Sequence, residues 1–316
     1  MTSPDGSHGL GYIPVAGLLG HRIGYSLSPM LHAAADEAGG ITCDYHLFDV
    51  PPEGLDGFLA HVMEFQDTIG FNVTTPFKEE VASRLDALHS DAREVGAVNV
   101  TALRGDHLIG YNTDRPAILS VIKAAINESE HPSDGWTVVV LGVGGAARAA
   151  SLALLDTGLV ENLVISARNR GKIHALKNDL YFACNKAGVT FSNQKWLDWG
   201  TLFVEPPAML INATPLGCAD GTGRIALASP HPPRRILKQF SIVIDLIYNP
   251  PKTGLIKASQ SAGIQTVGGA GMLIEQAVRS RAIWFGEGRE DKERAAMVAA
   301  YTSWEKKITS EKTDGN

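Results

Sequence analysis

The segment that most constrains the fold of this chain is the apolar run Val138–Leu141, followed at once by Gly142–Ala147 with the sequence GVGGAA. A short run without polar residues indicates a strand buried on both faces, and the alanine-rich stretch up to Gly158 predicts a helix after it. Glycines between the two allow a tight turn, and the free N–H groups of a helix N-terminus can hold a pyrophosphate. Ala147 stands where the usual pattern has its third glycine, and it is small enough for close packing. The segment predicts a dinucleotide-binding β-α-β unit; the alternative is a plain strand-to-helix turn.

The end of the next predicted strand, residues 162–167, bears on which dinucleotide binds. An acidic residue there would accept a hydrogen bond from a ribose 2′-hydroxyl, whereas an arginine would meet a 2′-phosphate. The sequence reads Ser166-Ala-Arg168-Asn169-Arg170, without a carboxylate. This favours NADP over NAD, the alternative being two solvated arginines at a strand end.

Short strand-like and helical segments alternate along most of the chain, which predicts an α/β architecture. Residues 96–112 read as a hairpin that turns at Gly105-Asp106, and further strands are expected within 209–214, 241–248 and 263–269. We therefore expect a Rossmann-type, doubly wound dinucleotide-binding domain at 115–268. The final helices, within 269–316, are expected to return to the first domain, residues 1–114.

Composition excludes several other classes of protein. The chain has 316 residues, of which 44% are hydrophobic and 20% charged, and its net charge of −6 comes without a dense Lys/Arg run. We expect neither nucleic acid nor a membrane as a partner, because no basic patch and no apolar run of about 18 residues is present. Cys43, Cys184 and Cys218 are odd in number, far apart and never in a C-x-x-C or Cys/His spacing, so we expect neither a disulfide framework nor a zinc site. We expect a cytoplasmic protein, because neither a signal peptide nor an anchor is visible. Residues 1–12 and 307–316 have the composition of irregular ends.

Ser26-Leu-Ser28-Pro29 precedes a predicted helix in the first domain. Pro29 fits the first helical position and Ser28 the N-cap, so capping alone accounts for Ser28. Ser26 has no such local role. Hydroxyls beside a helix N-terminus suit a carboxylate, and we expect substrate binding here.

Lys78 follows Asn72-Val-Thr74-Thr-Pro-Phe and opens a predicted helix whose buried stripe is Val81, Leu85 and Leu88. A lysine at the positive end of a helix is unusual for stability alone, which makes Lys78 a candidate proton carrier; the alternative is an ordinary surface lysine.

Three further polar residues stand out by their place in the sequence. Asp114 begins a predicted helix, where an N-cap is its ordinary role. Asn99 lies on an apolar strand and Gln276 in an apolar helix, and each is either a satisfied core amide or a ligand-binding group.

Together, these segments resemble the shikimate dehydrogenase family, including the quinate/shikimate dehydrogenases, from about Val15 to Gly286. The motifs that carry the resemblance occur in the family's order: SLSP (26–29), NVTTPFK (72–78), AVN (97–99), NTD (112–114), GVGGAARA (142–149), INATPLG (211–217), DLIYNP (245–250) and GMLIEQA (271–277).

The resemblance implies a substrate domain, an NADP-binding domain and reversible reduction of 3-dehydroshikimate to shikimate in the cleft between them. Lys78 matches the family's catalytic lysine and Asp114 its partner, and no metal is implied. The implied substrate-binding residues are Ser26, Ser28, Asn72, Thr74, Asn99, Asp114, Tyr248 and Gln276. The implied cofactor-binding residues are Gly142, Val143, Gly144, Gly145, Ala146, Arg168, Asn169, Leu246, Gly269 and Met272.

Two departures from the family pattern leave alternatives open. The usual Asn-Arg-Thr reads Ala167-Arg168-Asn169, so NAD remains possible as cofactor. The glycine that usually follows NTD is replaced by Arg115-Pro116, which is expected to stiffen the hinge and add charge near the cleft. The alternatives are a quinate or quinate/shikimate dehydrogenase that uses NAD, and a catalytically silent regulatory relative. The sequence does not determine the oligomeric state.

Overall fold

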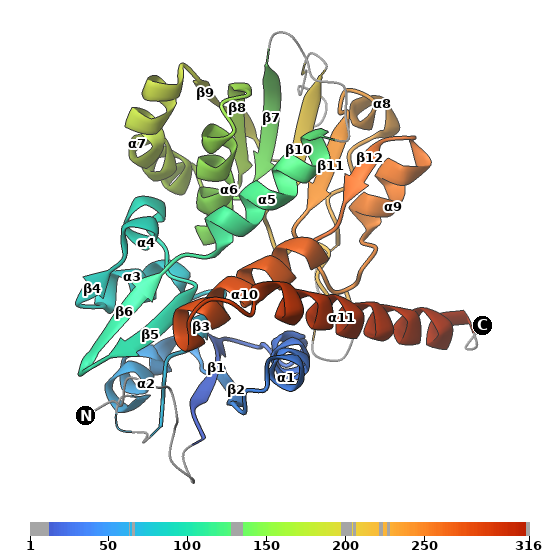
Figure 1. The fold of residues 1–316 in the computed structure, drawn as a ribbon. Helices are drawn as coiled ribbons and strands as arrows, with labels where there is room; N and C mark the ends of the chain where they lie inside the picture. The colour runs from blue at the N-terminus through green and yellow to red at the C-terminus, as the bar shows by residue number, and fades with distance from the viewer. Residues whose placement is uncertain are drawn as a thin grey trace.

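The computed structural model describes residues 13–313 except 63, 65–66, 128–134, 197–203, 205–206, 221–223 and 226–227. The predicted irregular start, residues 1–12, lies outside these. Two six-stranded sheets form the described part of the chain, one above the other in Figure 1, and helices surround both.

The first sheet has the strand order β2-β1-β3-β5-β6-β4. Its strands are β1 (Val15–Gly20), β2 (Asp44–Asp49), β3 (Asn72–Val73), β4 (Ala87–Leu88), β5 (Val100–Arg104) and β6 (His107–Tyr111). The helical segments between them are α1 (Ser28–Gly39), the 3-10 turn η1 (Pro52–Gly54), α2 (Leu55–Val62), α3 (Lys78–Arg84) and α4 (Ser90–Val95). β1 runs parallel to β2 and β3, whereas β5 is antiparallel to β3 and β6.

The predicted hairpin is confirmed, because β5 and β6 pair through Arg104 and His107 around Gly105, whose φ is +61°. The predicted helix up to Leu88 is wrong at its end. The backbone of Leu85 is extended, and Ala87 and Leu88 pair with β6 as the edge strand β4. The leucines at 85 and 88 are still partly buried, packed against Val81 and its neighbours.

The second sheet is parallel throughout, with the order β12-β11-β10-β7-β8-β9. Its strands are β7 (Trp136–Leu141), β8 (Val160–Ala167), β9 (Thr190–Lys195), β10 (Ala208–Asn212), β11 (Ile242–Asp245) and β12 (Gln265–Val267). Read from β9, this is the order 3-2-1-4-5-6 of a doubly wound dinucleotide-binding sheet, in which ligands bind where the order reverses. The reversal lies between β7 and β10, and the predicted fold class is confirmed.

Helices cover both faces of this sheet because its strands are buried on both sides. They are α5 (Asp114–Asn127), α6 (Gly145–Asp156), α7 (Arg170–Ala187), α8 (Arg234–Leu237) and α9 (Gly254–Ser261). Val138 and Val140 pack with residues of α5, α6 and α7, whereas Val139 and Leu141 pack with residues of α8 and α9. An uninterrupted apolar strand is what two such faces require.

The last two helices, α10 (Ala270–Phe285) and α11 (Glu290–Thr313), pack against α1 (Figure 1). The prediction of an irregular segment from 307 is wrong up to Thr313. Tyr301, Trp304 and Ile308 continue the helical spacing of partly or fully buried residues, and this pattern extends the helix. Among the described helices, none combines the length and apolarity that crossing a bilayer requires.

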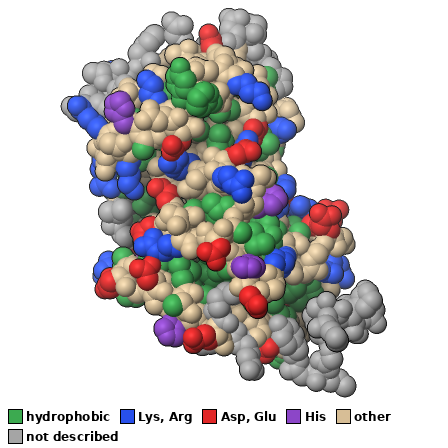
Figure 2. All heavy atoms as spheres, turned by 90° about the vertical axis from the view of Figure 1, so that its left-hand side faces the viewer, with side chains coloured by type: hydrophobic (Ala, Val, Ile, Leu, Met, Phe, Trp, Pro, Cys, Tyr) green, Lys and Arg blue, Asp and Glu red, His purple; other side chains and the backbone are tan. Residues whose placement is uncertain are grey.

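Charges of both signs are spread over the surface. On the face that Figure 2 shows, the Lys/Arg and Asp/Glu side chains are interspersed rather than gathered by sign.

Candidate functional site

Two adjoining cavities lie where the two sheets face each other. The first, of about 180 Å³, is lined mainly by segments of the first sheet, by α10 and by the loops after β10 and β11. The second, of about 450 Å³, is lined by the glycine-rich turn after β7 and the end of β8. Lys78 and Ala146 line both cavities. Lys78 therefore lies on the boundary between the two cavities.

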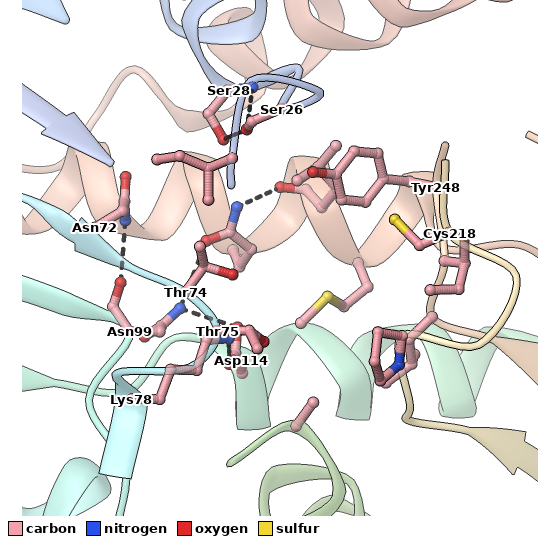
Figure 3. Close-up of a pocket in the computed structure, with 18 of the residues that line it drawn as sticks. Ser26, Ser28, Asn72, Thr74, Thr75, Lys78, Asn99, Asp114, Cys218 and Tyr248 are labelled. Atoms are coloured by element: carbon pink, nitrogen blue, oxygen red, sulfur yellow. Dashed lines mark hydrogen bonds and ion pairs between the residues drawn. The ribbon is translucent and has the colours of Figure 1, made fainter. Parts of the chain in front are cut away.

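Lys78 and Asp114 form an ion pair at this boundary (Figure 3). Lys78 Nζ donates to Asp114 Oδ2 at 2.6 Å, and the two side chains are 17% and 2% exposed. Lys78 is the first residue of α3 and Asp114 the first of α5, so two helix starts converge here. The N-cap role considered for Asp114 is wrong, because Asn112 Oδ1 accepts the Arg115 N–H instead. The carboxylate of Asp114 is free to hold the lysine.

Asn99 fixes the other oxygen of Asp114. Its Nδ2 donates to Asp114 Oδ1 at 2.9 Å and to Thr113 Oγ1 at 2.8 Å, while its Oδ1 accepts the Thr113 N–H. Asn99 is therefore a satisfied buried amide, and it also lines the first cavity, where its binding of a ligand stays a prediction. The amide of Gln276 donates to the Leu273 carbonyl and also borders this cavity.

Ser26 and Ser28 lie across the cavity from Lys78, at the start of α1 (Figure 3). Their predicted local roles are wrong. Helix α1 begins at Ser28, its N-cap position is Leu27, and Pro29 is therefore its second residue. Ser26 Oγ accepts a hydrogen bond from the Ser28 N–H and donates one to Ser28 Oγ. Ser26 therefore does have local hydrogen bonds at the start of the helix, and Ser28 is not the N-cap. Both hydroxyls still face a helix N-terminus.

The polar lining continues on the two remaining sides of the cavity. Asn72 is held by the Tyr45 hydroxyl, which donates to its Oδ1 at 2.8 Å, and its Nδ2 donates to Ser280 Oγ. Tyr248 lies opposite Asn72 in Figure 3, and burial raises its pKa, so its hydroxyl stays protonated. Thr74 lines the same cavity.

The second cavity fits a dinucleotide. No side chain caps the N-terminus of α6, whose first residues line the cavity. The first N–H groups of this helix are therefore available to a bound phosphate. Gly142 has φ of +116°, and a Cβ there would lie 3.0 Å from the Ala213 carbonyl oxygen. A Cβ on Gly145 would lie 3.2 Å from Ala97 and 3.3 Å from the Cβ of Lys78. Glycine at these two positions therefore lets the turn pack closely against the loop after β10 and against the start of α3.

The predicted cofactor residues fall into three groups. Those of the turn and of the end of β8 line the second cavity: Gly142, Val143, Gly144, Gly145, Ala146, Arg168 and Asn169. Leu246 and Met272 line the first cavity instead. Gly269 lines neither cavity, and a Cβ there would lie 2.3 Å from the Leu246 carbonyl oxygen, so it allows close packing of two loops. The side chain of Asn169 accepts the Lys172 N–H as the N-cap of α7.

Several lining residues were not predicted from the sequence. Lys172 borders the second cavity, as Arg168 does. Tyr25 and Cys218 border the first cavity, and burial raises their pKa to about 12 and about 11. Nothing in the local sequence marks these two residues. In the described part of the chain, no group of three or more His, Cys, Asp or Glu residues could hold a metal ion.

Arg115 does not add charge to the cleft, contrary to expectation. Its side chain lines neither of the two cavities and is paired with Glu94 and Asp156. The two carboxylates offset its charge.

A doubly wound parallel sheet beside a second α/β unit, with a buried lysine–aspartate pair between their cavities, defines a two-part protein of the dinucleotide-dependent dehydrogenase type. Comparison with known proteins specifies the family. Residues 18–101 match the family model described as the shikimate dehydrogenase substrate binding domain. A curated shikimate dehydrogenase (NADP(+)) of Symbiobacterium thermophilum is 36% identical over 287 residues, 90% of this chain and 94% of the relative.

Solved structures of a shikimate dehydrogenase and of another reductase are similar to this one. A shikimate 5-dehydrogenase of Thermus thermophilus, solved with NADP(H) and shikimate, is 29% identical to this chain with a TM-score of 0.71. The match covers 91% of this chain and 100% of the Thermus chain. A 5-ketofructose reductase of a Gluconobacter species is 28% identical to this chain with a TM-score of 0.69. The match covers 92% of this chain and 99% of the reductase chain. This chain belongs to the shikimate dehydrogenase family.

Proposed function

We propose that this protein catalyses the reversible, NADP-dependent reduction of 3-dehydroshikimate to shikimate. The observation that carries the proposal is the place of the Lys78–Asp114 pair, on the boundary between a cavity lined with hydroxyl and amide groups and a cavity lined by a glycine-rich turn. We also propose the domain division 1–114, 115–268 and 269–316. A cytoplasmic location is part of the same proposal, since all three cysteines are free.

The lysine is the proton carrier in this proposal. When bound, NADPH supplies a hydride to the substrate carbon, and NADP+ accepts it in the reverse direction. Lys78 Nζ donates a proton to the carbonyl oxygen as the hydroxyl forms, and removes it in the reverse direction. Asp114 holds Nζ in place through Oδ2, and Asn99 holds Asp114 through Oδ1.

The rest of the first cavity binds the substrate in this proposal. Ser26 and Ser28, at the positive end of α1, suit its carboxylate, because hydroxyl groups and a helix N-terminus both favour negative charge. The remaining polar groups suit its ring oxygens, and they are Asn72, Thr74, Asn99, Tyr248 and Gln276.

The preference for NADP follows from charge at the end of β8. Arg168 and Lys172 line the cavity there, and residues 166–172 include no carboxylate. Two cations suit a 2′-phosphate, whereas the NAD ribose would lack its usual acidic partner.

The test is an oxidation assay that crosses shikimate and quinate with NADP+ and NAD+ at equal concentrations. We expect shikimate with NADP+ to give the highest kcat/KM of the four pairs. A higher value for quinate with NAD+ would assign the protein to the alternative activity. No oxidation in any pair would favour a silent relative or another substrate, and the reduction of 5-ketofructose by NADPH is then the next reaction to measure.

A further inference from the structure

Arg115 connects the two halves of the molecule at the start of α5. Its Nε and Nη2 each donate to Asp156 at 2.7 Å, through Oδ2 and Oδ1, and its Nη1 donates to Glu94 Oε2 at 2.5 Å. The Arg115 side chain is 19% exposed. A guanidinium held by three hydrogen bonds to two carboxylates has a fixed position, since its fork matches a carboxylate in two places at once.

The two carboxylates belong to different sheets. Glu94 lies in α4, between β4 and β5 of the first sheet, and Asp156 is the last residue of α6, between β7 and β8 of the second. Both α4 and α5 contact α6. Arg115 therefore joins the two units at the point where the chain crosses between them.

Helices α5 and α6 also carry groups that must align for the reaction, namely Asp114 of the Lys78–Asp114 pair and the end of the glycine-rich turn. Asp114, which holds Lys78, immediately precedes Arg115, and α6 begins at Gly145 of the glycine-rich turn. The two units approach so closely there that a Cβ on Gly145 would lie 3.3 Å from the Cβ of Lys78. A small change in the opening between the units would therefore change the distance between the lysine and a dinucleotide on the turn.

We propose that Arg115 is a positioning residue that sets the opening of the cleft by tying α4 and α6 to the start of α5. It touches neither cavity, and it acts on the reaction through Asp114 and the glycine-rich turn.

The test compares Arg115→Ala with Arg294→Ala. Arg294 is a matched control, because it also pairs with two carboxylates, Glu275 at 3.0 Å and Asp291 at 2.7 Å, but all three residues lie within α10 and α11. We expect Arg115→Ala to lower kcat about tenfold, because small misplacements of reacting groups are costly, and Arg294→Ala to leave it within about twofold. Arg115→Lys should recover only part of the loss, since an ammonium cannot hold Asp156 in two places.

A double-mutant cycle separates positioning from a loss of folding. Once Arg115 is alanine, Asp156→Asn should lower kcat no further. Arg115→Ala should also be fully folded at the assay temperature, which its thermal unfolding curve checks. A kcat within twofold of wild type in Arg115→Ala, or full recovery with lysine, would overturn the inference. Equal losses of kcat in the two alanine variants would also overturn it.

The kinetic readout rests on the proposed function, so a second measurement is made without substrate. Hydrogen exchange of the protein alone should rise in α4 and at the end of α6 in Arg115→Ala and stay unchanged in Arg294→Ala. A wild-type protein inactive on shikimate would refute the proposed function and leave this exchange difference to decide on Arg115. Equal exchange in the two variants would refute the role of Arg115.

Discussion

Replacing Lys78 by methionine removes the ammonium group and keeps most of the side-chain volume. Because Lys78 Nζ is the proton carrier of the proposed reaction, we expect kcat to fall by roughly 10²–10⁴ with a modest change in KM. NADP affinity should change little, because methionine keeps most of the side-chain volume where Lys78 lines the second cavity. Steady-state oxidation of shikimate measures kcat and KM, and calorimetry measures the affinity for NADP.

The same change has a cost in stability that the structure allows us to assign. Asp114 is 2% exposed, and without Lys78 its carboxylate keeps Asn99 as a partner but has no opposite charge. Removing one member of a buried ion pair costs about 3–5 kcal/mol, and the 17% exposure of Lys78 places this pair near the lower end, at about 3 kcal/mol. Urea unfolding of both proteins gives this difference.

A double variant separates stability from catalysis. Lys78→Met with Asp114→Asn replaces the pair by neutral groups, so we expect most of the lost stability to return and kcat to stay low. A Lys78→Met variant that keeps more than half of the wild-type kcat would refute the assigned mechanism. Recovery of kcat in the double variant would show that the single variant fails through folding alone.

Three further predictions follow from the site and its surroundings. Gln276→Ala should weaken shikimate binding by about 1–3 kcal/mol and leave NADP affinity unchanged, because polar groups of a closed cavity lose a partner; calorimetry with each ligand checks this. Arg168→Ala should lower the ratio of kcat/KM for NADP to that for NAD by roughly 10- to 100-fold, and an unchanged ratio would argue against a phosphate contact. Burial, aided by the nearby charge of Arg281, holds the pKa of His32 well below its usual value, so the folded state stays unprotonated where the unfolded state takes up a proton. Stability should therefore fall by up to about 1.4 kcal/mol per pH unit below about pH 6.5, and His32→Phe should remove this slope in urea unfolding at pH 7 and pH 5.

The features of the fold that local sequence specifies were predictable. The strand, turn and helix of Val138–Gly158 follow from an apolar run, glycines and alanines within one short segment. The hairpin at Gly105 depends on two adjacent residues in the same way. Such features need no knowledge of the rest of the chain.

Features that depend on distant contacts were predicted less well. Lys78 and Asp114 are 36 residues apart, and their partnership came from the family resemblance rather than from either residue's neighbours. Leu88 continues a helical spacing, yet pairing with β6 makes it part of a strand. Arg115 was expected near the cleft because of its place after Asp114, but its direction is set by Glu94 and by Asp156, 41 residues further along the chain.

The most direct test of the central claim is the reduction of 3-dehydroshikimate by NADPH with the purified protein, followed by chromatographic identification of the product. We expect one molecule of shikimate to form for each NADPH consumed, and the Lys78→Met variant to form it far more slowly. A protein that consumes no NADPH, or consumes it without forming shikimate, would refute the proposed function.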